Sequence, residues 1–125
     1  RPGLVLAHAQ LDPAHPDHEV SNEYLAILRA STDASGRPLE VVEVPAPRTT
    51  HVDGELVDWG YINHYVCNDA VILCTFDDPN DEVAAEILAK AYAGRQIVLH
   101  DARAIFECGG GIHCITQQQP AVQAV

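Results

Sequence analysis

The residues best suited to chemistry in this sequence are a cysteine and the three glycines shortly before it. Residues 109–111 are all glycine, and Ile-His-Cys follows them directly. Glycine weakens a β-strand and adds no packing, but it suits a backbone that approaches a ligand closely. On this pattern Cys114 would face a confined cleft, with Gly110 and Gly111 where the backbone approaches a bound ligand. The alternative is a glycine-rich turn that leads to an ordinary buried cysteine.

His113 directly precedes Cys114, which suggests a cysteine–histidine pair. In an extended segment, however, adjacent side chains point to opposite faces. We therefore expect His113 to make a structural contact behind the site. A different histidine, brought from elsewhere in the fold, would have to activate Cys114.

His51 and Asp53 offer a second candidate base with its orienting carboxylate. Together with Cys114 they would form a Cys–His–Asp set within this chain. The pair nevertheless lies in a polar, irregular stretch over residues 46–60. The alternative is that His51 and Asp53 belong to a solvated surface loop.

The composition indicates one modest globular domain that does not bind nucleic acid or membranes. The chain has 125 residues, 47% of them hydrophobic and 20% charged, with a net charge of −11. An acidic surface repels phosphate backbones and attracts small cations such as amines and guanidines, although it also serves solubility alone. No apolar run approaches the roughly 18 residues of a membrane helix, and no signal-peptide pattern is visible.

Four cysteines are present, without the C-x-x-C spacing of a metal site. Cys67 and Cys74 lie within apolar, strand-like runs, where a free thiol behaves as a small hydrophobic side chain. We therefore expect free thiols rather than a cysteine metal site, and a location in the reducing cytosol.

The hydrophobic pattern predicts a mixed α/β domain whose helices each lead into a strand. Two similar units are suggested by this order, which is β-α-β, a hairpin, α-β and a glycine-rich β segment. The expected strands cover 4–7, 39–44, 61–67, 70–76 and 97–99; the helices cover 18–32 and 80–93, with one helical turn at 102–106. A tight hairpin is expected at Asn68 and Asp69.

Residues 109–120, Gly-Gly-Gly-Ile-His-Cys-Ile-Thr-Gln-Gln-Gln-Pro, resemble the terminal signature of agmatine deiminases. This signature is highly specific, and supporting segments follow the family's order along nearly the whole chain. They are residues 1–7, 36–41, 61–66 (Tyr-Ile-Asn-His-Tyr-Val), 77–81 (Asp-Asp-Pro-Asn-Asp) and 102–105 (Ala-Arg-Ala-Ile).

The resemblance implies a chemistry for one residue in particular. Cys114 aligns with the nucleophile that attacks the guanidinium carbon, displaces ammonia and forms an amidino-thioether. A histidine then activates water to release the product, while acidic side chains hold the planar guanidinium. For agmatine, the products would be N-carbamoylputrescine and ammonia, with no metal or organic cofactor.

The resemblance also implies that the active site extends outside this chain. The family's catalytic His-x-Asp lies just before the segment that resembles residues 1–3, and another substrate-binding carboxylate lies in the N-terminal part. The sequence departs from the family at Cys108 (usually Gly), Gly111 (often Asn), His64 (usually Phe) and Cys74 (usually Pro).

Family members fold as a closed fan of five αβ units, a pentein-like αβ-propeller with mixed short sheets and helices outside. Residues 1–125 would supply about the last two units, as the C-terminal portion of the domain. The expected partner is a small cationic guanidine, together with a missing N-terminal portion or copies in a homo-oligomer. One alternative is a non-catalytic module of the same fold that binds a small cation or a protein, and another is an enzyme for arginine-type substrates.

Overall fold

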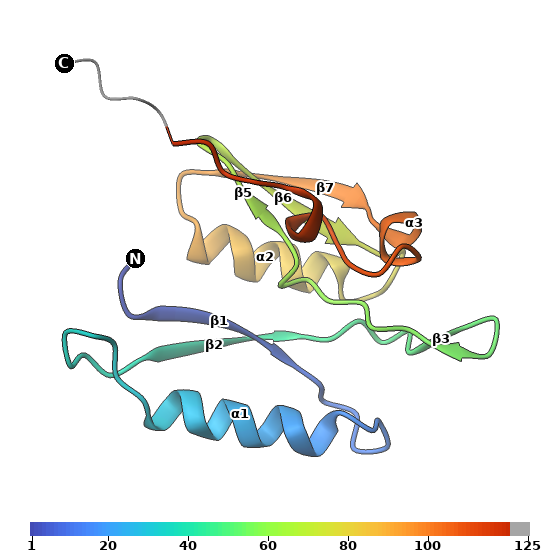
Figure 1. The fold of residues 1–125 in the computed structure, drawn as a ribbon, viewed down its shortest axis with the longest axis horizontal. Coiled ribbons are helices and arrows are strands. Elements are labelled where there is room, and N and C mark those ends of the chain that lie inside the picture. The colour runs from blue at the N-terminus through green and yellow to red at the C-terminus, as the bar shows by residue number, and fades with distance from the viewer. Residues whose placement is uncertain (121–125) are drawn as a thin grey trace.

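The computed structural model describes residues 1–120 as a mixed α/β fold with three small sheets (Figure 1). Its elements are β1 (Leu4–Ala9), α1 (His18–Ala30), β2 (Glu40–Pro45), β3 (His51–Val52), β4 (Glu55–Leu56), β5 (Tyr65–Val66), β6 (Ala70–Thr75), α2 (Asp81–Ala91), β7 (Gln96–Asp101), α3 (Arg103–Phe106) and the 3₁₀ helix η1 (His113–Ile115). The expected order of helices and strands is confirmed up to α3, except that the stretch 46–60, expected to be irregular, contains the short hairpin of β3 and β4. Within residues 1–120, none of the helices combines the length and apolar character that crossing a bilayer requires.

The first unit is a parallel βαβ arrangement of β1, α1 and β2. The two strands pair in register from Leu4 opposite Glu40 to Ala9 opposite Pro45. Helix α1 packs on this small sheet through Leu25, which is buried together with Ala9. A parallel pair needs a crossover connection, and α1 supplies it.

The second unit repeats this arrangement and adds one strand. Strands β6 and β7 are parallel neighbours, and α2 connects them along the chain. Strand β5 pairs antiparallel with β6. The expected hairpin is confirmed, with the backbone N–H of Cys67 donating to the carbonyl of Ala70 at 2.9 Å. Its first strand is shorter than expected, because Tyr61 and the residues after it turn inward before β5 begins.

The layers follow one another as α1, the β1–β2 sheet, α2 and the β5–β6–β7 sheet (Figure 1). Helix α1 covers an outer face, as expected. Helix α2 contacts both β2 and β7 and so lies between the two sheets, not outside them. Its buried residues Ala84 and Leu88 join the main core.

The helical spacing of Val20, Tyr24, Ile27 and Leu28 predicts the apolar face of the first helix, and this prediction is partly wrong. Val20 and Ile27 are exposed, whereas Ser21 and Leu25 are the buried residues of α1. Residues 21, 25 and 28 follow the i, i+4, i+7 spacing of one helix face, and this is the face that meets the sheet. The presence of several apolar residues at helical spacing predicted the helix but not its orientation.

An aromatic cluster fills the centre of the main core, beneath the segment that carries Cys114. The Phe76 side chain, 2% exposed, stacks on Trp59 with ring centroids 4.9 Å apart. The ring of Phe106 meets the ring of Phe76 edge-on, with centroids 5.2 Å apart. Because Trp59 precedes β5 and Phe106 ends α3, this cluster joins segments that flank the candidate site.

Asp78 connects the start of α2 to the polar segment after β2. Its buried carboxylate accepts hydrogen bonds from the backbone N–H groups of Thr49 at 2.8 Å and Asn80 at 2.9 Å. Burial by itself would raise the pKa of Asp78, but hydrogen bonds from Asn80, Thr49 and Arg48 outweigh it and lower the pKa. The ionised carboxylate therefore stabilises the folded chain.

We expect Asp78→Asn to reduce the free energy of unfolding at pH 7 by about 1–3 kcal/mol, because the variant loses charge-assisted bonds to a buried group. Because the folded pKa is depressed, this contribution is present above the unfolded value of about 3.9 and disappears as the pH falls through the folded pKa. Urea unfolding between pH 7 and pH 3 should show the two proteins converging in acid. A constant difference across that range would contradict the role of ionisation, and the exposed Asp69→Asn serves as the control.

Candidate functional site

Cys114 lies in the 3₁₀ helix η1, on a tight loop after α3. The expected glycine-rich β segment is therefore wrong. The backbone N–H of Cys114 donates to the carbonyl of Gly111 at 3.1 Å, and that of Thr116 donates to His113 at 3.2 Å. These short-range bonds satisfy the backbone locally, so the segment needs no strand partner. Ile112 is buried and anchors the loop in the core, whereas Cys114 is exposed.

Asn63, which precedes β5, contacts the cysteine loop at several atoms. Its side-chain Nδ2 donates to the Cys114 sulfur at 3.1 Å. Its Oδ1 accepts from the backbone N–H of His113 at 2.9 Å and of Cys114 at 3.3 Å. Sequence reasoning did not select Asn63 as a site residue; the only signal was its place in the Tyr-Ile-Asn-His-Tyr segment.

The hydrogen bond from Asn63 favours the ionised form of the Cys114 thiol. It is the main reason that the pKa of Cys114 lies below the ordinary value for a thiol, and the backbone of Gly111 contributes in the same direction. The thiolate is the nucleophilic form of cysteine. An exposed sulfur with a lowered pKa is therefore suited to attack an electrophilic carbon.

Gly110 and Gly111 leave space that side chains would fill. Gly110 has a φ of +153°, and a Cβ there would lie 3.0 Å from the Cys114 sulfur. A Cβ on Gly111 would lie 2.6 Å from Cγ of Asn63 and 2.7 Å from the ring of Phe106. Gly111 stands where many members of the resembled family have Asn. In this chain, Asn63 and Phe106 occupy the space that a side chain at Gly111 would need.

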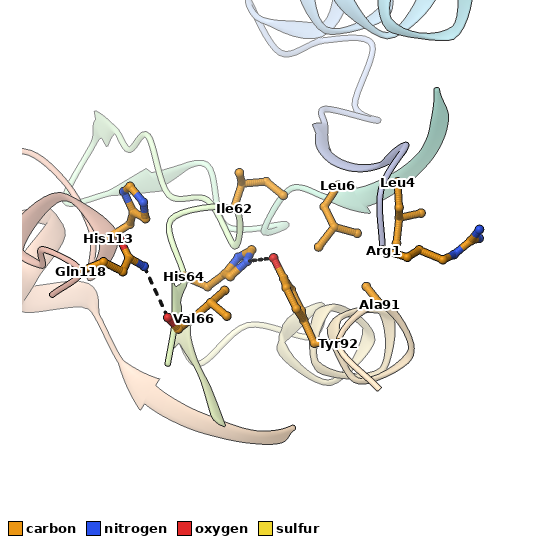
Figure 2. A pocket seen from close by; sticks show the side chains of 10 residues that line it. All are labelled: Arg1, Leu4, Leu6, Ile62, His64, Val66, Ala91, Tyr92, His113 and Gln118. Atoms are coloured by element: carbon orange, nitrogen blue, oxygen red, sulfur yellow. Dashed lines mark hydrogen bonds between the residues drawn. The ribbon is translucent and has the colours of Figure 1, made fainter. Parts of the chain in front are cut away.

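The reason given for separating the His113 side chain from Cys114, an extended segment, is wrong. The segment is a 3₁₀ helix and not extended, yet the imidazole lines a cavity of about 340 Å³ to which Cys114 does not contribute (Figure 2). Among residues 1–120, no hydrogen bond joins the His113 ring to Cys114. Figure 2 places His113 beside Gln118, whose side-chain amide donates to the carbonyl of Val66 at 3.4 Å.

His64 lies deeper in the same cavity and is held as a neutral ring. Burial lowers its pKa and outweighs the hydrogen bond to the Tyr61 carbonyl. Its Nδ1 lies 2.9 Å from that carbonyl oxygen, and its Nε2 lies 3.0 Å from the Tyr92 hydroxyl, which Figure 2 shows. Because the carbonyl can only accept, Nδ1 carries the proton and Nε2 accepts from Tyr92. Both ring nitrogens are therefore occupied by structural contacts.

The structure does not bring His51 and Asp53 to Cys114. They lie in and next to β3, in a small hairpin with β4 that extends away from the cysteine segment (Figure 1). Both residues are exposed, and the His51 ring lies 3.0 Å from the Thr50 hydroxyl. Asp53 has a φ of +50°, which the turn of the hairpin requires.

An open hollow beside Asn63 contains one acidic side chain. Its volume is about 440 Å³, and its lining residues are Asp58, Gly60, Ile62, Asn63, Phe106 and His113. The described residues, 1–120, contain no group of three or more His, Cys, Asp or Glu side chains placed to hold a metal ion. Residues 1–120 thus present an exposed thiol that accepts a hydrogen bond from Asn63, without a base hydrogen-bonded to the sulfur.

Residues 1–120 match the model of a protein family described as Porphyromonas-type peptidyl-arginine deiminase. The protein of Streptomyces avermitilis named "Putative agmatine deiminase" is 62% identical over 120 residues, which cover 96% of this chain and 35% of the relative. The "Putative agmatine deiminase 1" of Listeria monocytogenes (strain EGD-e) is 38% identical over 138 residues, covering 96% and 38%. This chain therefore spans little more than a third of these curated relatives.

Solved structures show the same fold. The agmatine deiminase of Enterococcus faecalis superimposes with a TM-score of 0.88 at 29% identity, covering 95% of this chain and 37% of that chain. An X-ray structure named as a putative agmatine deiminase has a TM-score of 0.89 at 33% identity, covering 97% and 36%. The mixed α/β arrangement of short sheets and helices is thus shared with these proteins.

Proposed function

This chain belongs to the Porphyromonas-type peptidyl-arginine deiminase family, and from that membership we propose that it forms the C-terminal part of a guanidine hydrolase that acts on agmatine. The observation that carries the proposal is the presentation of Cys114. Its exposed sulfur accepts a hydrogen bond from Asn63 at 3.1 Å, on a loop whose glycines leave the approach to the sulfur open. Relatives and solved structures named as agmatine deiminases support agmatine as the substrate.

In the proposed reaction, the Cys114 thiolate attacks the central carbon of the guanidinium group. The carbon–nitrogen bond to one terminal NH2 breaks, and that nitrogen leaves as ammonia after it takes up a proton. The carbon then remains bound to sulfur as an amidino-thioether. A water molecule, deprotonated by a histidine outside this chain, adds to the same carbon and the carbon–sulfur bond breaks. Agmatine and water thus give N-carbamoylputrescine and ammonia, and Cys114 is regenerated.

Gly110 and Gly111 form the substrate side of this loop in the proposal. A side chain at Gly110 would stand 3.0 Å from the attacking sulfur, so its absence leaves room for a planar guanidinium. The net charge of −11 favours a cationic substrate near this surface. An arginine-type substrate would carry a further carboxylate or backbone, and the hollow beside Asn63 contains no basic side chain except His113 to meet it.

We propose that the two αβ units are the last two of a pentein-like fan, residues 1–125 being its C-terminal portion. Val98 and Leu99 are 39% and 53% exposed on β7, the edge strand of its sheet, as expected of an edge that further units cover. Those units, or copies in a homo-oligomer, would supply the histidine and the guanidinium-binding carboxylates. The four free cysteines suit a reducing cytosol, where the product would enter polyamine synthesis.

We expect this chain alone to release no ammonia from agmatine above the rate of a Cys114→Ser control, because within residues 1–120 no base is hydrogen-bonded to the Cys114 sulfur. A longer protein that contains this segment together with the family's His-x-Asp should release ammonia and N-carbamoylputrescine in equal amounts. Mass spectrometry and an ammonia assay measure both products, and free arginine and an arginyl peptide test the substrate class. Turnover of arginine or the peptide in preference to agmatine would contradict the substrate assignment. No turnover of any guanidine would support the non-catalytic alternative.

A further inference from the structure

The orientation of the Asn63 side chain is determined by its contacts. One amide atom accepts from two backbone N–H groups, those of His113 at 2.9 Å and Cys114 at 3.3 Å. Only the oxygen of an amide can accept, so this atom is Oδ1. The NH2 group must therefore lie on the other side, where it donates to the Cys114 sulfur at 3.1 Å. A single side chain thus binds both the backbone and the thiol of the same residue.

Asn63 is itself held in place from several directions. Its backbone carbonyl accepts from the His113 N–H at 3.2 Å and from the buried thiol of Cys74 at 3.1 Å. The absent side chain of Gly111 admits its Cβ and Cγ, which lie 2.8 Å and 2.6 Å from where a Cβ on that glycine would stand. A side chain confined in this way loses little further freedom when it engages the sulfur.

We propose that Asn63 is the positioning residue of the nucleophile: its amide oxygen holds the loop of η1 and its amide N–H is directed at the attacking sulfur. This proposal rests on the role of Cys114 proposed above. Among residues 1–120, no other side chain donates a hydrogen bond to that sulfur. An amide cannot take up the thiol proton at neutral pH, so Asn63 is not the general base. It acts through Cys114, by favouring the thiolate and fixing its direction.

Asn63→Asp separates the two functions of the amide. Aspartate has the same shape and keeps an oxygen that accepts from the loop, but it replaces the N–H donor with a negative charge beside the sulfur. The thiolate is then disfavoured, so the pKa of Cys114 should rise. We expect alkylation of Cys114 by iodoacetamide at pH 7 to be slower by about tenfold, and the pH profile of the rate to move to higher pH. The rate at high pH should approach that of the wild-type chain, because the sulfur stays accessible.

The measurement follows each thiol separately by peptide mass spectrometry across the pH range. Cys108 is exposed on the same loop and serves as the internal reference, with a rate that should not change. Asn68→Asp, which adds the same charge at the exposed β5–β6 turn, is the matched control and should leave the Cys114 profile in place. Asn63→Ala loses the donor without adding charge and should also move the profile to higher pH. Its circular dichroism spectrum, and that of Asn63→Asp, reports whether the fold is retained.

A Cys114 profile that stays at its wild-type position in folded Asn63→Asp or Asn63→Ala would overturn the proposal. This outcome is distinct from a failure of the proposed function, because alkylation needs neither substrate nor the rest of the enzyme. In a complete protein, the acid limb of the kcat/KM profile should move in the same direction as the alkylation profile. If the complete protein released no ammonia while the alkylation profile moved, the proposed function would fail and the role of Asn63 would stand.

Discussion

Replacing Cys114 with serine in a complete protein that contains this segment is expected to reduce agmatine turnover by at least about a thousandfold. Serine keeps the shape of the side chain, but its hydroxyl does not ionise near neutral pH. The hydrogen bond from Asn63, which favours a thiolate, cannot generate an alkoxide without a strong base. The measurement is ammonia release under saturating agmatine, together with peptide mass spectrometry of protein digested after a rapid acid quench.

The quench distinguishes a nucleophile from a binding residue. The wild-type protein should carry, on the peptide that contains Cys114, the mass of agmatine less ammonia, which is the amidino group with its aminobutyl arm, whereas Cys114→Ser should carry none. Cys108→Ser is the matched control, because Cys108 is a second exposed thiol close by in the sequence. It should retain turnover within about threefold of the wild type. Retained activity in Cys114→Ser, or an adduct on a different cysteine, would show that another group attacks the substrate.

The elements that the sequence predicted well are those with a strong pattern of their own. Helix α2 follows a run of acidic and capping residues, and β6 is a continuous apolar run with Val71 and Leu73 fully buried. The orientation of α1 was predicted less well, because apolar residues lie on more than one of its faces. Leu25 is buried and Ile27 is 60% exposed only because of where the β1–β2 sheet lies. That information is tertiary and is absent from the helix itself.

In the candidate site, too, one part was predicted from the sequence and another was not. The glycine run before Cys114 suggested a confined cleft, and the resemblance to agmatine deiminases then predicted Cys114 as the nucleophile. They did not reveal that Asn63, 51 positions earlier, donates to its sulfur. The glycines also misled the prediction of local structure, because Gly110 permits a φ of +153° and lets the chain turn into η1. The spacing of His51 and Asp53 imitates a catalytic pair, yet His51 lies in β3 of a short surface hairpin and Asp53, with a φ of +50°, lies in its turn.

Phe76→Ala is expected to reduce the free energy of unfolding by about 3–5 kcal/mol, the range for truncating a buried aromatic side chain. Phe76 is 2% exposed and contacts the rings of Trp59, Tyr61 and Phe106, with centroids 4.9, 5.4 and 5.2 Å away. A loss of this size is a large part of the roughly 5–15 kcal/mol typical of a domain. Urea unfolding followed by circular dichroism and by fluorescence of Trp59, the single tryptophan, measures the change.

Phe76→Ala also tests whether the core holds the loop that carries Cys114 in place. Phe106 packs against Phe76 and also borders Gly111, so a cavity at Phe76 removes one wall of the loop that carries Cys114. Alkylation of Cys114 should then lose its difference from that of Cys108, even in the folded fraction at low urea. Val52→Ala, at a 39% exposed position in β3, should change the free energy of unfolding by less than about 0.5 kcal/mol and leave the thiol rates unchanged. If Phe76→Ala lowered stability but left the relative rates as in the wild type, the loop would be organised by Asn63 and Ile112 alone.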